Sequence, residues 1–257
     1  MGKQSCPGLE TVFSPTMTNL ALTDSAILRC EDISKRFGDI QVLANIGFAV
    51  YPGEILGIIG PNGAGKTTLM ECMTGLLPCD SGSMCWKDQP LSPQQSSRVL
   101  YYLPDGILPY ADHRVGSVLG FFHQIYGAED SRYRLLIKRL NLDGVLAKRV
   151  HALSKGYRRR LLLTIGLLSP QPLLMLDEPF DGFDLRQTLG VMALLRETLA
   201  GRTLLLSIHQ LSEAEKICDR FLLLNEGTVA ATGNLDELRQ QAGLTAGGLE
   251  EVFLAIV

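Results

Sequence analysis

Residues 60–67 read Gly-Pro-Asn-Gly-Ala-Gly-Lys-Thr and fit G-x-x-x-x-G-K-[ST], the pattern of a phosphate-binding loop. Glycines let the backbone wrap closely around an anion, so that its N–H groups point at phosphate oxygens. At this spacing Lys66 can reach the β- and γ-phosphates of a nucleotide, and the Thr67 hydroxyl can bind Mg²⁺. The alternative is a glycine turn with an incidental lysine. The nucleotide-binding residues predicted here are Gly60, Pro61, Asn62, Gly63, Ala64, Gly65, Lys66, Thr67 and Thr68.

A second candidate segment, residues 173–178, reads Leu-Leu-Met-Leu-Asp-Glu and ends in two carboxylates. In α/β sheets ligands bind at the carboxyl ends of strands, so Asp177 is expected beside the phosphate loop. There it would hold Mg²⁺, directly or through water. Glu178 would reach the water that attacks the γ-phosphate, which makes it the predicted general base. The alternative is a strand end whose acids are merely solvated.

Strands and helices must position these two segments. The apolar run 55–59 suits a strand buried on both faces, and the helix predicted over 67–77 presents its positive end to the same anion. Because strands alternate with helices, we predict a mostly parallel α/β sheet with an antiparallel piece attached. Polar residues 87–97 are expected to form a surface loop. The remaining predicted elements are strands at 46–50, 173–176 and 204–208, helices at 155–168, 184–200 and 213–218, and a hairpin at 221–231.

The chain divides into regions of different composition. Residues 1–26 carry Ser, Thr, Pro, Gly and Asn without a hydrophobic period, which predicts a mobile leader. One domain is predicted over 27–257. Within it, the strand-poor stretch of about 106–153 is expected to be a helical subdomain, and about 234–257 a C-terminal tail.

Composition narrows the functional class. Among 257 residues, 24 Lys and Arg and 27 Asp and Glu give a net charge of −3, which argues against coating nucleic acid through bulk charge. The longest apolar run, 161–168, is far shorter than the roughly 18 residues that span a bilayer. The start of the chain lacks the pattern of a signal peptide. We therefore expect a cytoplasmic protein.

Residues 153–157, Leu-Ser-Lys-Gly-Tyr, add the most diagnostic motif. Together with the phosphate loop and the acidic strand end, they resemble the ATP-binding subunit of an ABC (ATP-binding cassette) transporter, over roughly 27–257. The motif resembles the family's L-S-G-G-Q signature: Ser154 and Gly156 match, whereas Lys155 and Tyr157 depart. The resemblance implies that Ser154 and Gly156 contact the nucleotide held by the other subunit of a dimer.

Further positions follow from this resemblance. His209 matches the switch histidine that contacts the γ-phosphate, and Asp184 matches the aspartate of the dimer-contact loop. Phe37 stands where the family stacks an aromatic ring on adenine, and a flat π-face is all that stacking needs. The alternative for Phe37 is an ordinary core residue.

Asp105 is the sharpest departure, because it follows Pro104 where the family has glutamine. An ionised aspartate offers only acceptors, whereas glutamine also donates. We predict Asp105 as a third metal ligand beside Thr67 and Asp177; the alternative is a loop aspartate that caps a turn. Three arginines, 158–160, follow the signature, and a solvated face is favoured for them over partner contacts.

The resemblance implies a P-loop NTPase fold with an antiparallel β subdomain and a helical insertion. It further implies an ATPase, with Lys66, Glu178 and His209 in catalysis and ATP and Mg²⁺ as cofactors. The expected partners are a second ATPase subunit and transmembrane permease subunits, without nucleic acid, at the cytoplasmic face of the membrane. The tail residues 249–254 resemble the end of subunits that serve exporters, so export is the expected direction. The alternative for the tail, which is favoured, is that its one apolar helical face docks on its own domain.

Three other functions remain open from the sequence. One is a non-transport ABC ATPase, and another is a different phosphate-loop enzyme such as a GTPase or a small-molecule kinase. The third is a degenerate ABC-type regulatory module with weak or no hydrolysis, which Asp105 and the altered signature keep open.

Overall fold

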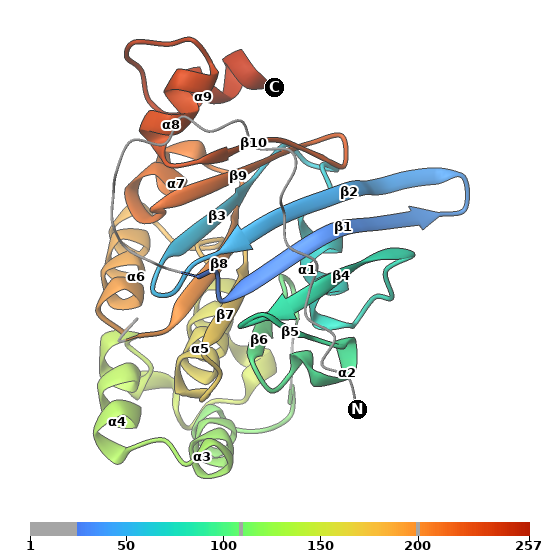
Figure 1. Cartoon of the computed structure of the whole chain (residues 1–257). Coiled ribbons are helices and arrows are strands. Elements are labelled where there is room, and N and C mark those ends of the chain that lie inside the picture. Colours follow the sequence, from blue (N-terminus) through green and yellow to red (C-terminus); the bar gives the residue numbers. More distant parts are fainter. Residues whose placement is uncertain (1–24, 108–109, 199–200) are drawn as a thin grey trace.

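The computed structural model describes residues 25–107, 110–198 and 201–257. The leader expected at 1–26 therefore lies outside the described residues except for its last two. Figure 1 shows a central sheet with helices packed on it and a second sheet at one side.

The central sheet has six strands in the order β10-β9-β3-β8-β7-β6. All neighbouring pairs are parallel except β9 and β10, which form the predicted hairpin. Parallel strands need crossovers, and here these are helical, which confirms the α/β prediction. The strands are β3 (Ile55–Ile59), β6 (Leu100–Leu103), β7 (Leu173–Asp177), β8 (Thr203–Ile208), β9 (Arg220–Asn225) and β10 (Thr228–Gly233).

The second sheet is antiparallel, with the order β2-β1-β4-β5. Its two long strands form the blue hairpin that projects beyond the central sheet in Figure 1. This is the predicted antiparallel piece. The strands are β1 (Leu28–Phe37), β2 (Ile40–Val50), β4 (Ser81–Trp86) and β5 (Gln89–Pro90).

The helices lie on both faces of the central sheet, with α1 on one face and α5, α6 and α7 on the other. Helix α1 follows β3 directly and contacts β2, β6 and β7, so it lies between the two sheets. Figure 1 places α3 and α4 at one end of the molecule and α8 and α9 at the other. The helices are α1 (Lys66–Thr74), α2 (Pro93–Ser96), α3 (Val115–Tyr126), α4 (Asp130–Arg139), α5 (Lys155–Leu168), α6 (Leu185–Thr198), α7 (Leu211–Ile217), α8 (Leu235–Gln241) and α9 (Leu249–Ile256), with 3₁₀ turns at Asp143–Val145 and Val150–Ala152.

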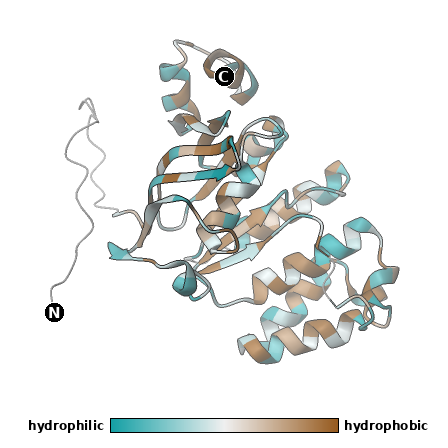
Figure 2. Ribbon diagram, turned by 90° about the vertical axis from the view of Figure 1, so that its right-hand side faces the viewer, coloured by the Kyte–Doolittle hydropathy of each residue, from teal (hydrophilic) through white to brown (hydrophobic). Residues whose placement is uncertain are grey.

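The buried strands contribute side chains to two hydrophobic cores, one on each face of the central sheet. Along β3, Leu56 and Ile58 pack with α1 and the antiparallel sheet, whereas Ile55 and Ile59 pack with the helices on the opposite face. Successive strand residues point to opposite faces, so an uninterrupted apolar run supplies both cores. Figure 2 shows hydrophobic residues along the central strands, with hydrophilic residues interspersed on the helices.

Several local elements differ from expectation. The expected loop at 87–97 contains β5 and the short helix α2, which begins after Ser92 with Pro93 at its first position. Strand β6 was not predicted. Helix α8 was also missed, although the sequence holds its start signal: Asn234 and Glu237 form a reciprocal capping box.

The C-terminal helix α9 docks on its own domain. Leu249 and Val252 are buried, and Phe253 and Ile256 pack against the same core. These four residues share one helical face, so α9 packs on its own domain through that face, as the docking alternative for the tail predicts. Among the described helices, none combines the length and the apolar character that crossing a membrane requires.

Candidate functional site

The phosphate loop connects β3 to α1 and depends on its glycines. Gly65 has φ +97°, and a Cβ atom there would lie 2.7 Å from the Leu43 side chain. Gly63 has φ +85° with open space around it. The loop is therefore packed against the antiparallel sheet at Gly65 and open at Gly63, which leaves a backbone cradle for an anion.

Lys66 lies folded into this loop. It is only 7% exposed, and its Nζ donates to the carbonyl oxygens of Gly60 at 2.8 Å and Pro61 at 3.1 Å. Burial lowers the pKa of Lys66, and the carboxylates of Glu178 and Asp177 oppose that shift. A desolvated ammonium group held against carbonyls at the mouth of an open loop can exchange those partners for phosphate oxygens.

Asp177 joins the loop to the end of β7. The Thr67 hydroxyl donates to its Oδ2 at 2.8 Å, the Ser207 hydroxyl donates to its Oδ1, and the Tyr102 hydroxyl lies 3.5 Å from Oδ2. Asp177 is 2% exposed. Hydroxyl and carboxylate oxygens are the hard ligands that Mg²⁺ prefers, so Thr67 and Asp177 fit the predicted metal.

Ser207 and Tyr102 were not predicted from the sequence. Ser207 carries a visible signal, because it is the polar residue inside the apolar run 204–208. It lies opposite Asp177 in the register of β7 and β8. Tyr102 lies on β6, the strand that was missed, and carries no comparable signal.

Glu178 is the first residue beyond β7 and has the left-handed φ of +47°. Its N–H donates to the Ser207 carbonyl at 3.1 Å, and its Oε2 lies 3.3 Å from Nδ1 of His209. The structure thus brings together the two residues predicted as general base and switch histidine. A carboxylate next to an imidazole at the mouth of the site can accept a proton from water.

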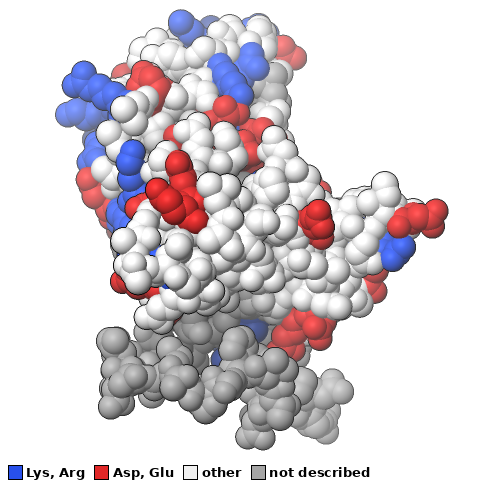
Figure 3. Space-filling view, turned by 90° about the horizontal axis from the view of Figure 1, so that it is seen from above, with Lys and Arg blue, Asp and Glu red and all other residues white. Residues whose placement is uncertain are grey.

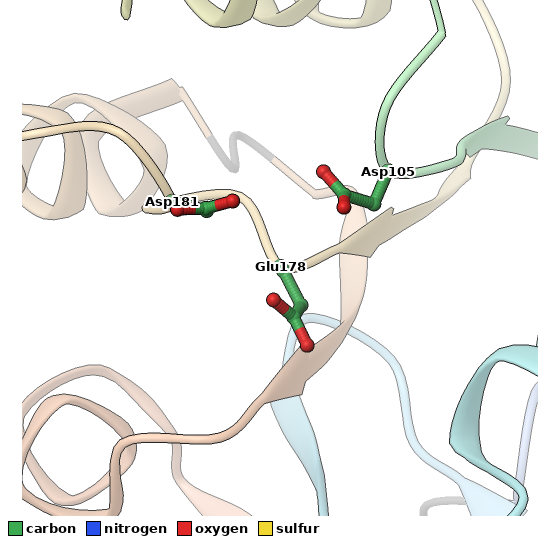
Figure 4. A group of neighbouring side chains, drawn as sticks. All are labelled: Asp105, Glu178 and Asp181. Carbon is green, nitrogen blue, oxygen red and sulfur yellow. The ribbon is translucent and has the colours of Figure 1, made fainter. Parts of the chain in front are cut away.

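Asp105, Glu178 and Asp181 offer oxygen atoms within 4.8 Å of one another. Figure 4 shows Glu178 and Asp181 on the loop after β7, with Asp105 entering from the segment after β6. Each carboxylate has a nearby nitrogen partner: Asp105 pairs with Arg159, Asp181 with Lys155 at 2.5 Å, and Glu178 with His209. The Lys155 hydrogen bond lowers the pKa of Asp181. Arg159 and Lys155 therefore compensate the charge of two of the three carboxylates, Asp105 and Asp181.

The signature residues lie at the start of α5. The Ser154 hydroxyl accepts from the Tyr157 N–H at 3.4 Å, so Ser154 is the N-cap of α5. A Cβ on Gly156 would lie 3.0 Å from the Gly182 carbonyl, so this glycine lets α5 approach the loop after β7. Within the part of the chain that the structure describes, the contacts of Ser154 and Gly156 are with these segments and not with residues 60–68.

The three arginines after the signature do not share one environment. Arg159 is 4% exposed, so the solvated-face prediction is wrong for it. Its guanidinium contacts Asp105 and the Asp177 carbonyl. Arg158 donates to the His151 carbonyl, and Arg160 lies over the Tyr157 ring at 5.0 Å. The helical period directs Arg159 toward the sheet and its two neighbours to other sides of α5. A count of consecutive arginines does not show this difference in burial.

Phe37 ends β1 and is 48% exposed, so the core alternative is wrong for this residue. The Nζ of Lys35 lies 5.5 Å from the ring centroid. An exposed ring beside a cation is suited to stacking on a flat heteroaromatic base.

Replacing Phe37 by alanine is expected to weaken ATP binding, because stacking of a base on an aromatic side chain contributes about 1–3 kcal/mol. The dissociation constant should rise by roughly 5- to 150-fold in a calorimetric titration. Phe37→Tyr keeps a flat ring and should bind like the wild type. An unchanged affinity in Phe37→Ala would remove this residue from the nucleotide site.

The fold and the site together define a nucleotide-binding P-loop protein. The family model described as "ABC transporter" matches residues 43–181. The chain belongs to the ABC transporter family, as an ATP-binding subunit, and the predicted fold class is confirmed.

Curated relatives and solved structures agree with this assignment. An uncharacterized ABC transporter ATP-binding protein of Methanocaldococcus jannaschii is 31% identical over 82% of this chain and 79% of its own length. The "Nod factor export ATP-binding protein I" of Burkholderia lata is 35% identical over 79% of this chain and 69% of its own. A solved "ATP binding subunit of ABC transporter" has a TM-score of 0.81 and 30% identity, covering 90% of this chain and 99% of that one.

Proposed function

We propose that this chain binds and hydrolyses ATP to power transport through a separate transmembrane partner. The observation that carries this proposal is the hydrogen bond between Thr67 and Asp177, which are 110 residues apart in sequence. It joins the phosphate loop to the acidic strand end, beside the Glu178–His209 pair.

Nucleotide binding is assigned to the backbone N–H groups of residues 60–68 other than Pro61, to the Lys66 ammonium group and to the exposed Phe37 ring. Thr67 and Asp177 would hold Mg²⁺, which when bound neutralises charge on the β- and γ-phosphates. Glu178 accepts the proton of the attacking water. His209, 3.3 Å from Glu178, donates toward the γ-phosphate side of the site.

The signature residues act on a second copy of the chain in this proposal. Ser154 is exposed and begins a 14-residue helix, whose first N–H groups and positive dipole end suit an anion. Since Ser154 and Gly156 make their own-chain contacts away from the phosphate loop, two chains arranged head to tail would complete each site. Asp184, in the loop before α6, belongs to the same proposed interface.

Family membership supports the transport part of the proposal. One relative carries the name of an export ATP-binding protein, and we propose export as the direction here as well. The chain would sit at the cytoplasmic face of the membrane against a permease subunit. We propose that the segment of about 106–153, which contains α3 and α4, forms the helical subdomain facing that partner, and that about 234–257 forms a separate tail.

Nucleic acid is not among the proposed partners. On the face that Figure 3 shows, Lys and Arg side chains lie among Asp and Glu side chains and wide uncharged areas. A nucleic-acid surface would gather positive charge along one stripe.

The test is purification of the tagged chain from detergent-solubilised membranes of its own cells. We expect an integral membrane protein to co-purify, and the complex to convert ATP to ADP and phosphate. Phosphorylation of a small molecule, or ATP binding without turnover, would favour a kinase or a regulatory module instead.

The same purified chain tests the head-to-tail arrangement by complementation. Lys66→Ala disables the loop, and Ser154→Arg disables the signature, so each variant alone should be inactive. In a mixed dimer one site keeps an intact loop and an intact signature. Mixing should therefore restore roughly a quarter of wild-type turnover if the sites act independently. Absence of any recovery would contradict shared sites.

A further inference from the structure

The peptide bond between Asp177 and Glu178 is held from both sides. Its carbonyl, that of Asp177, accepts a hydrogen bond from Nη1 of Arg159 at 3.3 Å. Its N–H, that of Glu178, donates to the carbonyl of Ser207 at 3.1 Å and lies 3.2 Å from the Ser207 hydroxyl. This one peptide plane links the proposed metal ligand to the proposed general base.

The backbone of Glu178 needs such support. Its φ of +47° lies in the left-handed region, which residues with a Cβ adopt infrequently and at a cost in free energy that surrounding contacts must offset. If the peptide plane rotated, the Glu178 side chain would leave the position in which its Oε2 lies 3.3 Å from His209.

Arg159 is the side chain that holds the carbonyl of this peptide. It is 4% exposed, although it is a charged residue, and its guanidinium divides between two acceptors. Nη2 pairs with the Asp105 carboxylate, and Nη1 reaches the Asp177 carbonyl. A planar fork with donors on both arms satisfies two acceptors at once, which a lysine ammonium group does not do in a fixed geometry.

Asp105 supplies the charge that keeps Arg159 in place. It comes from the segment after β6, whereas Arg159 lies on α5 and Asp177 ends β7, so the contact crosses three elements. The Asp105 side chain is 44% exposed and therefore remains solvated if its partner is removed. A buried guanidinium is strongly stabilised by an anionic partner. A glutamine at position 105 could accept a hydrogen bond through its amide carbonyl but would not balance the positive charge of Arg159.

We propose that Arg159 is a positioning residue that orients the catalytic base Glu178 through the Asp177 carbonyl, and that Asp105 anchors Arg159 instead of binding Mg²⁺. This inference rests on the proposed ATPase function. It assigns a role to a buried arginine of α5, and it accounts for a carboxylate at position 105.

The kinetic test compares Arg159→Gln with the wild type. Glutamine can reach only one acceptor, so the base loses its support. We expect kcat to fall by roughly 10- to 100-fold, since small misplacements of a catalytic group have effects of this size. The dissociation constant for ATP should stay within about threefold, because Lys66 and Thr67 do not contact Arg159. Arg159→Lys keeps the charge and should lie between the two. Unchanged kcat in Arg159→Gln would overturn the inference.

A double variant shows whether Arg159 acts through Glu178. In Glu178→Gln the base is already absent, so adding Arg159→Gln should lower the residual turnover by less than about twofold. A further fall as large as that of Arg159→Gln alone would assign Arg159 an independent role and contradict the proposal. Arg139→Gln is the matched control, since it breaks an exposed pair with Glu197 and should leave kcat unchanged.

The proposed role of Asp105 is tested separately, through the dependence of turnover on the Mg²⁺ concentration. If Asp105 anchors Arg159, Asp105→Asn lowers kcat but leaves the Mg²⁺ concentration for half-maximal turnover within about twofold. A tenfold rise in that concentration would make Asp105 a metal ligand and overturn this part.

Amide hydrogen exchange tests the inference without nucleotide. In unliganded Arg159→Gln, the amide of Glu178 should exchange roughly tenfold faster than in the wild type, while amides of β3 stay unchanged. Equal exchange at Glu178 would count against the positioning role even if turnover changed. Wild-type protein that neither binds nor hydrolyses ATP would instead refute the proposed function, and exchange would still report on the Arg159 contact.

Discussion

Replacing Glu178 by glutamine is expected to lower ATP turnover by roughly 10² or more while ATP binding persists. The amide is nearly isosteric but cannot accept a proton from water. Glu178 is well placed for this role, because its N–H is fixed by Ser207 and its Oε2 lies 3.3 Å from His209. Single-turnover phosphate release and calorimetric binding of ATP measure the two effects separately.

The control for this variant is Glu197→Gln, which makes the same chemical change at an exposed pair with Arg139. It should hydrolyse ATP like the wild type. Wild-type turnover in Glu178→Gln would exclude Glu178 as the base, and the proton would then have to pass to another group. Loss of ATP binding in the same variant would point to a structural role instead.

The second large effect is expected for Lys66→Ala. The ammonium group lies in the loop, and charge-assisted hydrogen bonds to an anion contribute about 1.5–3 kcal/mol. The dissociation constant for ATP should therefore rise by about 10- to 150-fold, and turnover should fall with it. Equilibrium binding of a fluorescent ATP analogue measures the affinity.

Lys138→Ala serves as the comparison, because this lysine lies exposed on α4. Its affinity for ATP should match that of the wild type. If Lys66→Ala bound ATP equally well, the phosphate-loop assignment would fail. Thermal unfolding should be compared as well, since Lys66 is buried and donates to Gly60 and Pro61 in the free protein.

The phosphate loop and the acidic strand end could be predicted because their chemistry is local. Eight consecutive residues define the loop, and an apolar run followed by two acids defines the strand end. Glycine geometry, a strand before the loop and a helix after it follow from the same short segments. The parallel pairing of five of the six central strands agrees with the alternation of strands and helices in the sequence.

The partners of these residues could not be predicted, because they come from distant parts of the chain. Arg159 meets Asp105 across 54 positions, and Tyr102 reaches Asp177 across 75. The helical period points the three arginines in different directions, and the packing of α5 on the sheet then decides that Arg159 is the one that points inward. Short elements such as α2 and β5 were missed for a different reason, since a few residues carry no period.

The strand order of the central sheet also fixes the distance between the phosphate loop and Asp177. Strand β8 lies between β3, which leads into the phosphate loop, and β7, which ends in Asp177. Neighbouring strands lie about 4.8 Å apart, so the strands that carry these two groups are held about 10 Å from each other by backbone hydrogen bonds. Side chains on β8 and α1, Ser207 and Thr67, then bridge the interval. Because backbone hydrogen bonds to β8 set the distance between β3 and β7, substitutions of side chains in the outer helices can accumulate without changing that distance.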